Sequence, residues 1–333
     1  MTDEKASLII TIKNEESTIE NLLDSILNQR KKPDQIVIVD GGSTDGTLEI
    51  ISKYKDILPI KLISHKNANI AKGRNLAISH AKYPIIAVTD AGCILDQNWY
   101  KEIVRPIEIL NVDVVSGIYF GTGDSLFQKV VSQLLVYNFD KVKGDSFSPS
   151  SRSIAFKKKA WKRVKGYPEW LNYAEDTYFN RKLREIGCTF YLNKKAIVYW
   201  QMRSNILKLF KQHFNYAMYD AIGLNNIHSY ALKMLFWYIF IFILTSSIML
   251  NLYLLTFTIL IVFLTLFSYV VFRKIGFSKL TIKKFFLGLV IIITVEITKF
   301  LGYFYGLLKR ARQMVKEIID GKLRKIITLL MTI

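Results

Sequence analysis

Two aspartates stand where apolar runs end, and an acidic pair opens a polar stretch further along the chain. Asp40 closes QIVIVD (35–40), Asp90 lies in TDAGC (89–93), and Glu175 and Asp176 adjoin in AEDTYF (174–179). Such carboxylates can ligate a divalent cation beside phosphates, or take a proton from an attacking hydroxyl group. An isolated acidic pair more often only favours a helix N-terminus, so the surrounding elements must decide.

The elements around these acids alternate in type up to about residue 230. The apolar runs at 7–12, 35–40, 61–64 and 84–90 indicate strands, and the amphipathic stretches at 16–29, 45–54, 69–81 and 98–110 indicate helices. This alternation predicts an α/β fold with a parallel sheet covered on both faces. Ligands gather at the carboxyl ends of such strands, where Asp40 and Asp90 are expected.

The composition narrows the classes of partner. The 333 residues carry 46 Lys+Arg against 27 Asp+Glu, a formal net charge of +19, which suits nucleic acid, an anionic membrane or phosphorylated substrates. No nucleic-acid module accompanies the charge, so we expect no nucleic-acid partner. The four histidines share no ligand spacing, and Cys93 and Cys188 are expected as free thiols. The N-terminus has no secretory signal, which predicts a cytoplasmic first domain.

After residue 230 the chain becomes that of a membrane protein. The stretches 231–250 and 251–272 contain one charged residue, Lys233, and each has the ~20 residues that a bilayer requires. They predict two spans joined by a tight turn. A third apolar stretch, 285–308, contains Glu296 and Lys299, which could neutralise each other or face protein.

The charges flanking these stretches leave the topology open. The loop after the second span is basic, with Arg273, Lys274, Lys279, Lys283 and Lys284, and is expected on the cytoplasmic side. The tail, 309–333, is basic as well, with Lys309, Arg310, Arg312, Lys316, Lys322, Arg324 and Lys325. A third full crossing would put this tail outside. Either the third stretch is re-entrant or interfacial, or the positive-inside rule fails here.

Residues 203–230 connect the two parts. Within 203–223, apolar residues recur at helical spacing on one side, with Lys208 and Lys211 elsewhere. One interpretation is an amphipathic helix on the membrane surface, and the other is a core helix of the N-terminal domain. The pattern favours neither.

Several motifs occur in a recognisable order. TIKNEE (11–16) ends the first strand, VDGGSTDGT (39–47) follows the second, NIAKGRN (69–75) and TDAGC come next, and GYPEWLNYAED (166–176) completes the series. Over about residues 5–205 the chain resembles the family-2 glycosyltransferases. The resemblance implies a GT-A nucleotide-diphosphosugar-transferase domain, Rossmann-like, over 1–202, a UDP- or GDP-sugar donor, and Mg²⁺ or Mn²⁺.

The resemblance also implies roles on the donor side. It assigns nucleotide-sugar binding to six residues: Thr11, Lys13, Glu15, Asp40, Arg74 and Asp90. Asp90 is also the implied metal ligand. Relatives carry Asp-x-Asp at this strand end, whereas here Gly92 replaces the second acid, so the cation would depend on one carboxylate, the diphosphate and water.

On the acceptor side the resemblance makes Asp176 the general base and gives Glu175 a positioning role. Arg152, in SPSSRSIAF (148–156), and Gln201 and Arg203, in YWQMRSN (199–205), fall at acceptor-side positions. The last segment only partly matches the Gln-x-x-Arg-Trp motif of processive synthases, because its spacing is short and no tryptophan follows.

The expected activity is therefore inverting transfer of a sugar to a membrane-associated, lipid-linked or polyprenyl-phosphate acceptor. The enzyme would be multi-pass in the cell membrane, with its membrane region at 231–308 and its catalytic domain cytoplasmic. Two alternatives remain at this point. One is a component of polysaccharide elongation, which needs a channel that these spans could hardly form alone. The other is a non-catalytic membrane scaffold derived from a glycosyltransferase.

Overall fold

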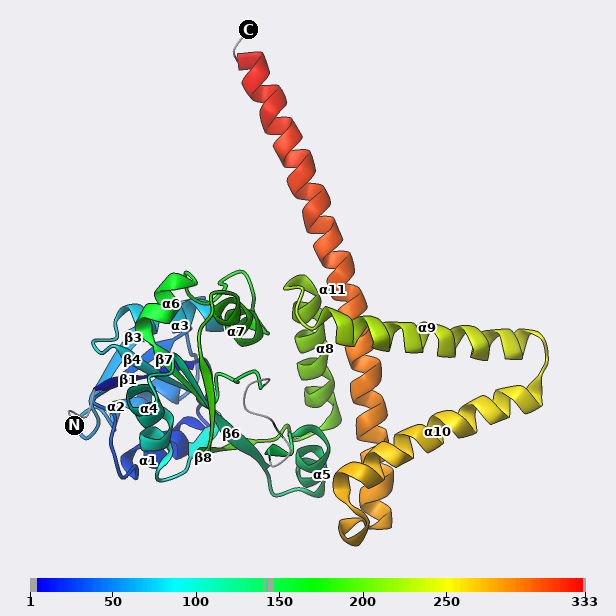
Figure 1. The fold of residues 1–333 in the computed structure, drawn as a ribbon, viewed down its shortest axis with the longest axis horizontal. Helices are drawn as coiled ribbons and strands as arrows, with labels where there is room; N and C mark the ends of the chain where they lie inside the picture. Colours follow the sequence, from blue (N-terminus) through cyan, green and yellow to red (C-terminus); the bar gives the residue numbers. More distant parts are fainter. Residues whose placement is uncertain (1–4, 140–141, 143–146, 332–333) are drawn as a thin grey trace. The chain divides into compact units, whose positions relative to one another are not determined.

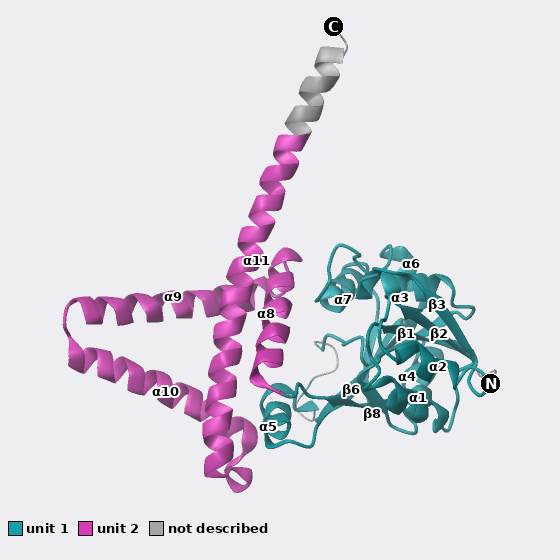
Figure 2. Cartoon of the chain, turned by 180° about the vertical axis from the view of Figure 1, so that it is seen from behind, with its two compact units in different colours: residues 1–204 teal, residues 205–333 magenta. Residues whose placement is uncertain are grey.

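The computed structural model describes residues 5–139, 142 and 147–331, with side chains described up to residue 320. The chain divides into two compact units, 1–204 and 205–333 (Figure 2).

The first unit is built on one eight-stranded sheet in the order β3-β2-β1-β4-β7-β6-β8-β5 (Figure 1). The strands are β1 (Ala6–Ile12), β2 (Gln35–Asp40), β3 (Ile60–Ser64), β4 (Ile85–Asp90), β5 (Cys93–Leu95), β6 (Val114–Thr122), β7 (Ile154–Lys157) and β8 (Phe190–Gln201). The first four are mutually parallel, as predicted. However, β7 is antiparallel to both β4 and β6, so the sheet is mixed and the prediction of a wholly parallel sheet is wrong. Strands β6 and β8 are parallel to each other, and β5 is antiparallel to β8.

Helices cover both faces of this sheet, because successive side chains of a buried strand point to opposite sides. The helices are α1 (Ile19–Leu27), α2 (Thr47–Ser52), α3 (Ile70–Ser79), α4 (Trp99–Ile109), α5 (Leu126–Leu135), α6 (Lys158–Arg163) and α7 (Glu175–Glu185). Leu8 and Ile10 of β1 pack in the cluster that includes α1, α2 and α4, whereas Ile9 packs with α3, α6 and α7. Figure 1 shows α3 and α6 on the opposite side of the sheet from α1 and α4.

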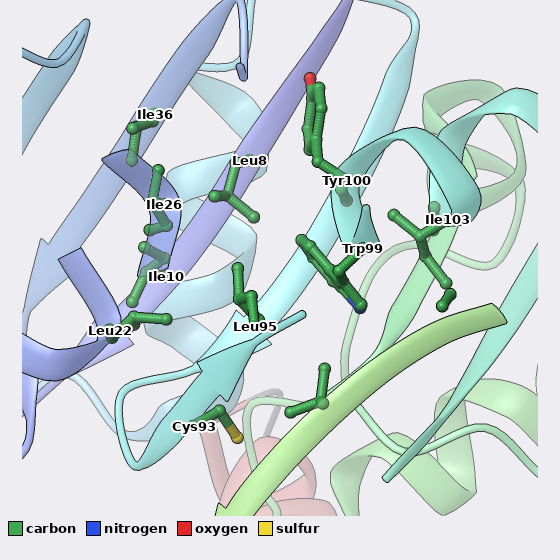
Figure 3. Close-up of a cluster of buried hydrophobic side chains, with 14 of the residues drawn as sticks. Leu8, Ile10, Leu22, Ile26, Ile36, Cys93, Leu95, Trp99, Tyr100 and Ile103 are labelled. Atoms are coloured by element: carbon green, nitrogen blue, oxygen red, sulfur yellow. The ribbon is translucent and has the colours of Figure 1, made fainter. Parts of the chain in front are cut away.

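Two large aromatic residues at the start of α4 lie in the hydrophobic core (Figure 3). Trp99 and Tyr100 are fully buried, and each finds a partner for its polar atom. Trp99 Nε1 donates to Ser153 Oγ at 2.8 Å, and Tyr100 Oη donates to the Ala6 carbonyl at 2.7 Å. Large aromatic surface is thus buried without leaving an unsatisfied donor.

The second unit is helical. It contains α8 (Ile206–Ile222), α9 (Ile227–Met249), α10 (Tyr253–Ile275), a short 3₁₀ turn η3 (Phe277–Lys279) and α11 (Ile282–Met331). Among the described residues, three helices are long and apolar enough to cross a membrane: α9, α10 and residues 282–320 of α11. A tight turn joins α9 to α10, as predicted, and Asn251 adopts a left-handed conformation in it (φ 56°).

Helix α8 packs along α11 through small residues. A Cβ atom on Gly302 would lie 2.5 Å from the Phe214 carbonyl oxygen, and one on Gly306 would lie 2.3 Å from that of Met218. Only glycine permits so close an approach of two helix backbones. Because α8 lies in the second unit, its interpretation as a core helix of the N-terminal domain is wrong. Its position on a membrane surface stays a prediction.

The charges inside the third apolar stretch are paired. Lys299 Nζ lies 3.1 Å from Glu296 Oε1, and Lys233 Nζ of α9 lies 2.9 Å from Glu296 Oε2. Both sequence-based possibilities therefore hold, since the i, i+3 pair forms and Glu296 also meets a charge on another helix.

Candidate active site

The carboxyl ends of the parallel strands bring the first motifs together. In the sheet register Thr11 is opposite Asp90 and Ile12 is opposite Asp40. The loops after β1 and β2 are also linked, because Thr44 N–H donates to Asn14 Oδ1 at 2.8 Å and Glu15 N–H donates to Thr47 Oγ1 at 2.8 Å. TIKNEE and VDGGSTDGT therefore form one surface, at the sheet edge where ligands were expected.

Asp40 shapes the turn that follows it. Its carboxylate accepts hydrogen bonds from the backbone N–H of Gly42 at 3.2 Å and from Ser43 N–H and Oγ at 3.0 and 2.7 Å. Gly42 has φ 92°, a left-handed conformation that suits glycine. Buried Asp40 thus holds the loop after β2. Its expected contact with the nucleoside stays a prediction.

Asp90 and Arg203 lie close enough to Glu15 for their charges to affect its pKa. Burial raises the pKa of Glu15, the hydrogen bond from Thr18 Oγ1 at 2.6 Å lowers it, and the charge of Asp90 raises it again. Exposed Arg203 has a smaller, lowering effect. The side chain of Lys13 passes 3.6 Å from the position that a Cβ atom on Gly41 would take. These expected donor-side residues are therefore neighbours.

Arg74 joins the donor-side and acceptor-side motifs. It is buried on α3, its Nη2 lies 2.7 Å from Asp90 Oδ1, and its Nη1 pairs with Glu175 Oε1. Burial alone would lower the pKa of Arg74, but the two carboxylates outweigh it and raise the pKa. Both ends of the guanidinium are thus occupied by protein, so Arg74 orders the two acids. Direct contact with a donor phosphate stays a prediction.

The acidic pair opens α7 in two different environments. Glu175 is buried, and burial raises its pKa, with the charge of Arg74 opposing this and that of Asp176 adding to it. Asp176 is half-buried, and its Oδ2 accepts from Ser151 N–H at 3.3 Å. The preceding Ala174 is left-handed (φ 56°), a strained state for alanine that sets the direction of the pair. Only Asp176 retains access to solvent.

The three expected acceptor-side residues lie around the ends of β7 and β8. Arg152 stacks over the Trp200 ring at 3.7 Å and donates from Nη1 to Ser150 Oγ at 2.7 Å. Its carbonyl oxygen accepts from Thr89 Oγ1, directly before Asp90. Exposed Gln201 ends β8, and its N–H donates to the Gly92 carbonyl at 3.4 Å. The loop of Asp90 therefore contacts this side too.

The site offers a cation few protein ligands. Among the described residues, no group of three His, Cys, Asp or Glu side chains could hold a metal. Asp90 Oδ1 faces Arg74, and within the same described set Oδ2 has no hydrogen-bond partner. A Cβ atom on Gly92 would meet nothing within 4 Å, so this position is open. Asp96 is engaged locally, since its Oδ1 accepts from Asn98 N–H at 3.0 Å. One carboxylate oxygen fits a cation that is held mainly by a diphosphate.

Sequence reasoning missed two asparagines that hold the loop before α7. Asn75 Oδ1 accepts from Tyr167 N–H at 2.8 Å and from Trp161 Nε1 at 3.0 Å, and its Nδ2 donates to the Tyr167 carbonyl at 2.9 Å. Asn69 caps α3 and donates to the Glu169 carbonyl at 2.6 Å. Their only signal in the sequence was their place on either side of Arg74 in NIAKGRN.

Comparisons with known proteins agree with this geometry. The profile of "Glycosyl transferase family 2" matches residues 7–187. The glycosyltransferase GlyA of Streptococcus pneumoniae is 23% identical over 67% of this chain, which spans only 34% of that protein. The O-antigen chain rhamnosyltransferase RfbN of Salmonella typhimurium is 24% identical over 65% of this chain and 73% of the length of RfbN.

Solved structures share the fold. Residues 1–349 of Staphylococcus aureus TarS align with TM-score 0.51 and 22% identity, over 67% of this chain and 66% of that one. The mannosyltransferase PcManGT of Pyrobaculum calidifontis, in complex with GDP-Man and Mn²⁺, aligns with TM-score 0.54 and 19% identity, over 66% and 62%. These likenesses establish a GT-A arrangement of the first unit.

Proposed function

Because the chain belongs to glycosyl transferase family 2, we propose that this glycosyltransferase transfers a sugar, with inversion, from a UDP- or GDP-sugar to a lipid-linked acceptor at a membrane. The observation that carries the proposal is the double ion pair of Arg74, which joins Asp90, 16 residues away in the sequence, to Glu175, 101 residues away. This contact supports the proposal that the donor-side and acceptor-side motifs belong to one site.

Asp176 is the proposed general base. It adjoins the ion-paired Glu175, is accessible to solvent, and stands at the N-terminus of α7, where the helix dipole favours a carboxylate. As the bond from the acceptor oxygen to the anomeric carbon forms and the bond to the diphosphate breaks, the acceptor proton passes to Asp176. Glu175 acts through Arg74 as a positioning residue.

Asp90 is the proposed protein ligand of Mg²⁺ or Mn²⁺. A bound cation would offset the charge of the leaving diphosphate. Thr11, Lys13, Glu15 and Asp40 would surround the nucleoside at the same sheet edge. Arg152, Gln201 and Arg203 are the proposed acceptor-side contacts.

The membrane helices support the choice of acceptor. The second unit, with its apolar helices, follows β8 directly, and β8 ends in the proposed acceptor-side residue Gln201. An enzyme held at a bilayer meets lipid-borne acceptors without a search through solution. The first domain is proposed to be cytoplasmic. The loop between α10 and α11 is basic, which favours the cytoplasmic side, and crossings by α9 and α10 would put the first domain on the same side as this loop.

The base assignment is tested by Asp176→Asn in the full chain. Transfer should fall by about 10²–10⁴-fold while nucleotide-sugar binding is retained, because only proton acceptance is lost. Asp113→Asn is the matched control, since Asp113 pairs with Lys157 at the amino end of β6 and should leave turnover unchanged. Full activity of Asp176→Asn would refute the assignment.

The acceptor class is tested with the purified enzyme and a panel of nucleotide sugars. Polyprenyl phosphate and lipid-linked glycans in detergent should accept sugar, and free sugars should not. Exclusive use of soluble acceptors would exclude the lipid-linked class.

A further inference from the structure

The ring contacts of α11 with the α9–α10 hairpin lie between the middle of α9 and the open end of the hairpin, away from the turn. On α9, Tyr230 stacks on Tyr303 at 4.2 Å and Trp237 lies 5.9 Å from the Phe300 ring. On α10, Phe272 lies 5.3 Å from the Phe285 ring. At the opposite end of the hairpin, its tip, α9 and α10 contact each other, and the Ser247 and Thr256 hydroxyls are 2.8 Å apart.

The distances along the helices show in which direction α11 runs relative to the hairpin. Tyr230 and Phe272 are each about 20 residues from the turn at 250–252, or roughly 30 Å along their helices. Their partners on α11, Tyr303 and Phe285, are separated by about 18 residues, or roughly 27 Å. Helix α11 therefore advances by nearly the thickness of a bilayer core between two contacts that lie at the same distance from the hairpin tip.

A third crossing requires a different set of contacts. A helix that entered beside the end of α10 and rose parallel to α9 would carry Tyr303 towards the tip, near Met249. In the structure Tyr303 instead contacts Tyr230, in the first turn of α9. Helix α11 thus runs across the base of the hairpin, and Figure 1 shows it crossing α9 and α10 rather than lying alongside them.

The charges agree with this direction. Glu296 and Lys299 lie near the middle of the apolar stretch 285–308, so a crossing helix would carry them to the bilayer centre, where ionised groups are expensive. Their partner Lys233 is in the second turn of α9, at the hairpin base. A hairpin base at the membrane surface would place all three charges at headgroup depth.

We propose that α11 lies in the bilayer interface across the base of the hairpin, so that the chain crosses the membrane twice, through α9 and α10. The lipid-facing side of α11 is an exposed apolar stripe: Phe286, Val290, Ile297, Leu301, Phe304 and Leu308. Its partner is an anionic lipid surface, because the basic residues of the loop before α11 and of the tail then lie on the same side. This removes the conflict with the positive-inside rule.

Single-cysteine variants of the full chain test the number of crossings. Buried Cys93 and Cys188 are replaced by alanine, and cysteine is introduced as Asn251→Cys at the hairpin tip, Ser278→Cys in the loop, or Asp320→Cys in the tail. An impermeant maleimide should label only the tip in intact cells, and the other two after permeabilisation. Labelling of Asp320→Cys in intact cells, or failure of the tip to label there, would overturn the proposal.

A depth measurement provides an independent readout. Nitroxide labels on Val290→Cys, Ile297→Cys and Phe304→Cys should show one common, shallow depth in vesicles that contain anionic lipid. A crossing helix would place Ile297 much deeper than the other two positions, and that profile would refute an interfacial α11.

Discussion

Replacing Arg74 with methionine should destabilise the first unit strongly, because two carboxylates lose their shared partner. The exposed fractions of the side chains are 2% for Arg74, 7% for Glu175 and 28% for Asp90. Breaking a buried pair by removing one partner costs about 3–5 kcal/mol, and most of this should come from Glu175, since Asp90 can regain water. Methionine keeps much of the side-chain volume, so the loss measures charge rather than a cavity.

A second substitution separates charge from packing. Adding Glu175→Gln to Arg74→Met removes the uncompensated charge and should restore about 2 kcal/mol at pH 8. At pH 6 the restoration should be smaller, because the raised pKa of Glu175 already lets it bind a proton when buried without its partner. Urea unfolding of the detergent-solubilised full chain, followed by tryptophan fluorescence, measures these differences.

The matched control is Arg181→Met on the surface of α7. Arg181 pairs with Glu185 at 3.1 Å, with side chains 39% and 43% exposed, so its loss should cost at most about 1 kcal/mol. If Arg74→Met lowers stability no more than this control, or if Glu175→Gln destabilises the Arg74→Met variant further, the described role of Arg74 is wrong.

Three further predictions concern Gly92, Glu175 and Gly302. Gly92→Asp should fold normally, because a Cβ atom at this position meets open space. The added carboxylate should tighten Mn²⁺ binding by roughly tenfold, or about 1.4 kcal/mol, in calorimetric titrations with a nucleoside diphosphate. An unchanged affinity would argue against a cation beside Asp90. Burial raises the pKa of Glu175 above its usual value, so the folded state binds this proton more tightly than the unfolded state. The stability of wild type relative to Glu175→Gln should therefore fall as the pH rises from 4.5 to 7 in urea titrations, and a rise would contradict the pKa shift. Gly302→Leu should lower the melting temperature of the solubilised chain by the equivalent of about 1–3 kcal/mol, because its side chain must displace the Phe214 backbone, and an unaltered melting curve would disprove the close helix contact.

Local patterns predicted the first half of the sheet well. Buried β-branched runs with helical periods between them indicate parallel strands, and this pattern predicts Asp40 and Asp90 at one edge of the sheet, where the structure has them. The direction of β7 left no such trace, since a short buried strand has the same composition whichever way it runs. Its antiparallel pairing with β4 and β6 is set by tertiary contacts.

Partnerships between distant residues were the other limit. The motif order placed Arg74 and Glu175 in one site, but a basic residue at a helix start gives no sign that it will be buried between two acids. Likewise, the period of α8 showed that it has an apolar face without showing that Gly302 and Gly306 of α11 would cover that face. Periodicity identifies a buried side and leaves its neighbour unspecified.

The two asparagines at the start of α3 and inside it have a consequence for building hybrid enzymes. Asn69 and Asn75 fasten the segment before α7, although roughly a hundred residues separate them from it. A chimera that takes the segment equivalent to 166–176 from a relative, to change the choice of acceptor, would therefore lack the hydrogen-bond partners that hold this segment in the relative. Such chimeras should work only when both asparagines, or the residues that replace them in the relative, are transplanted together with the segment.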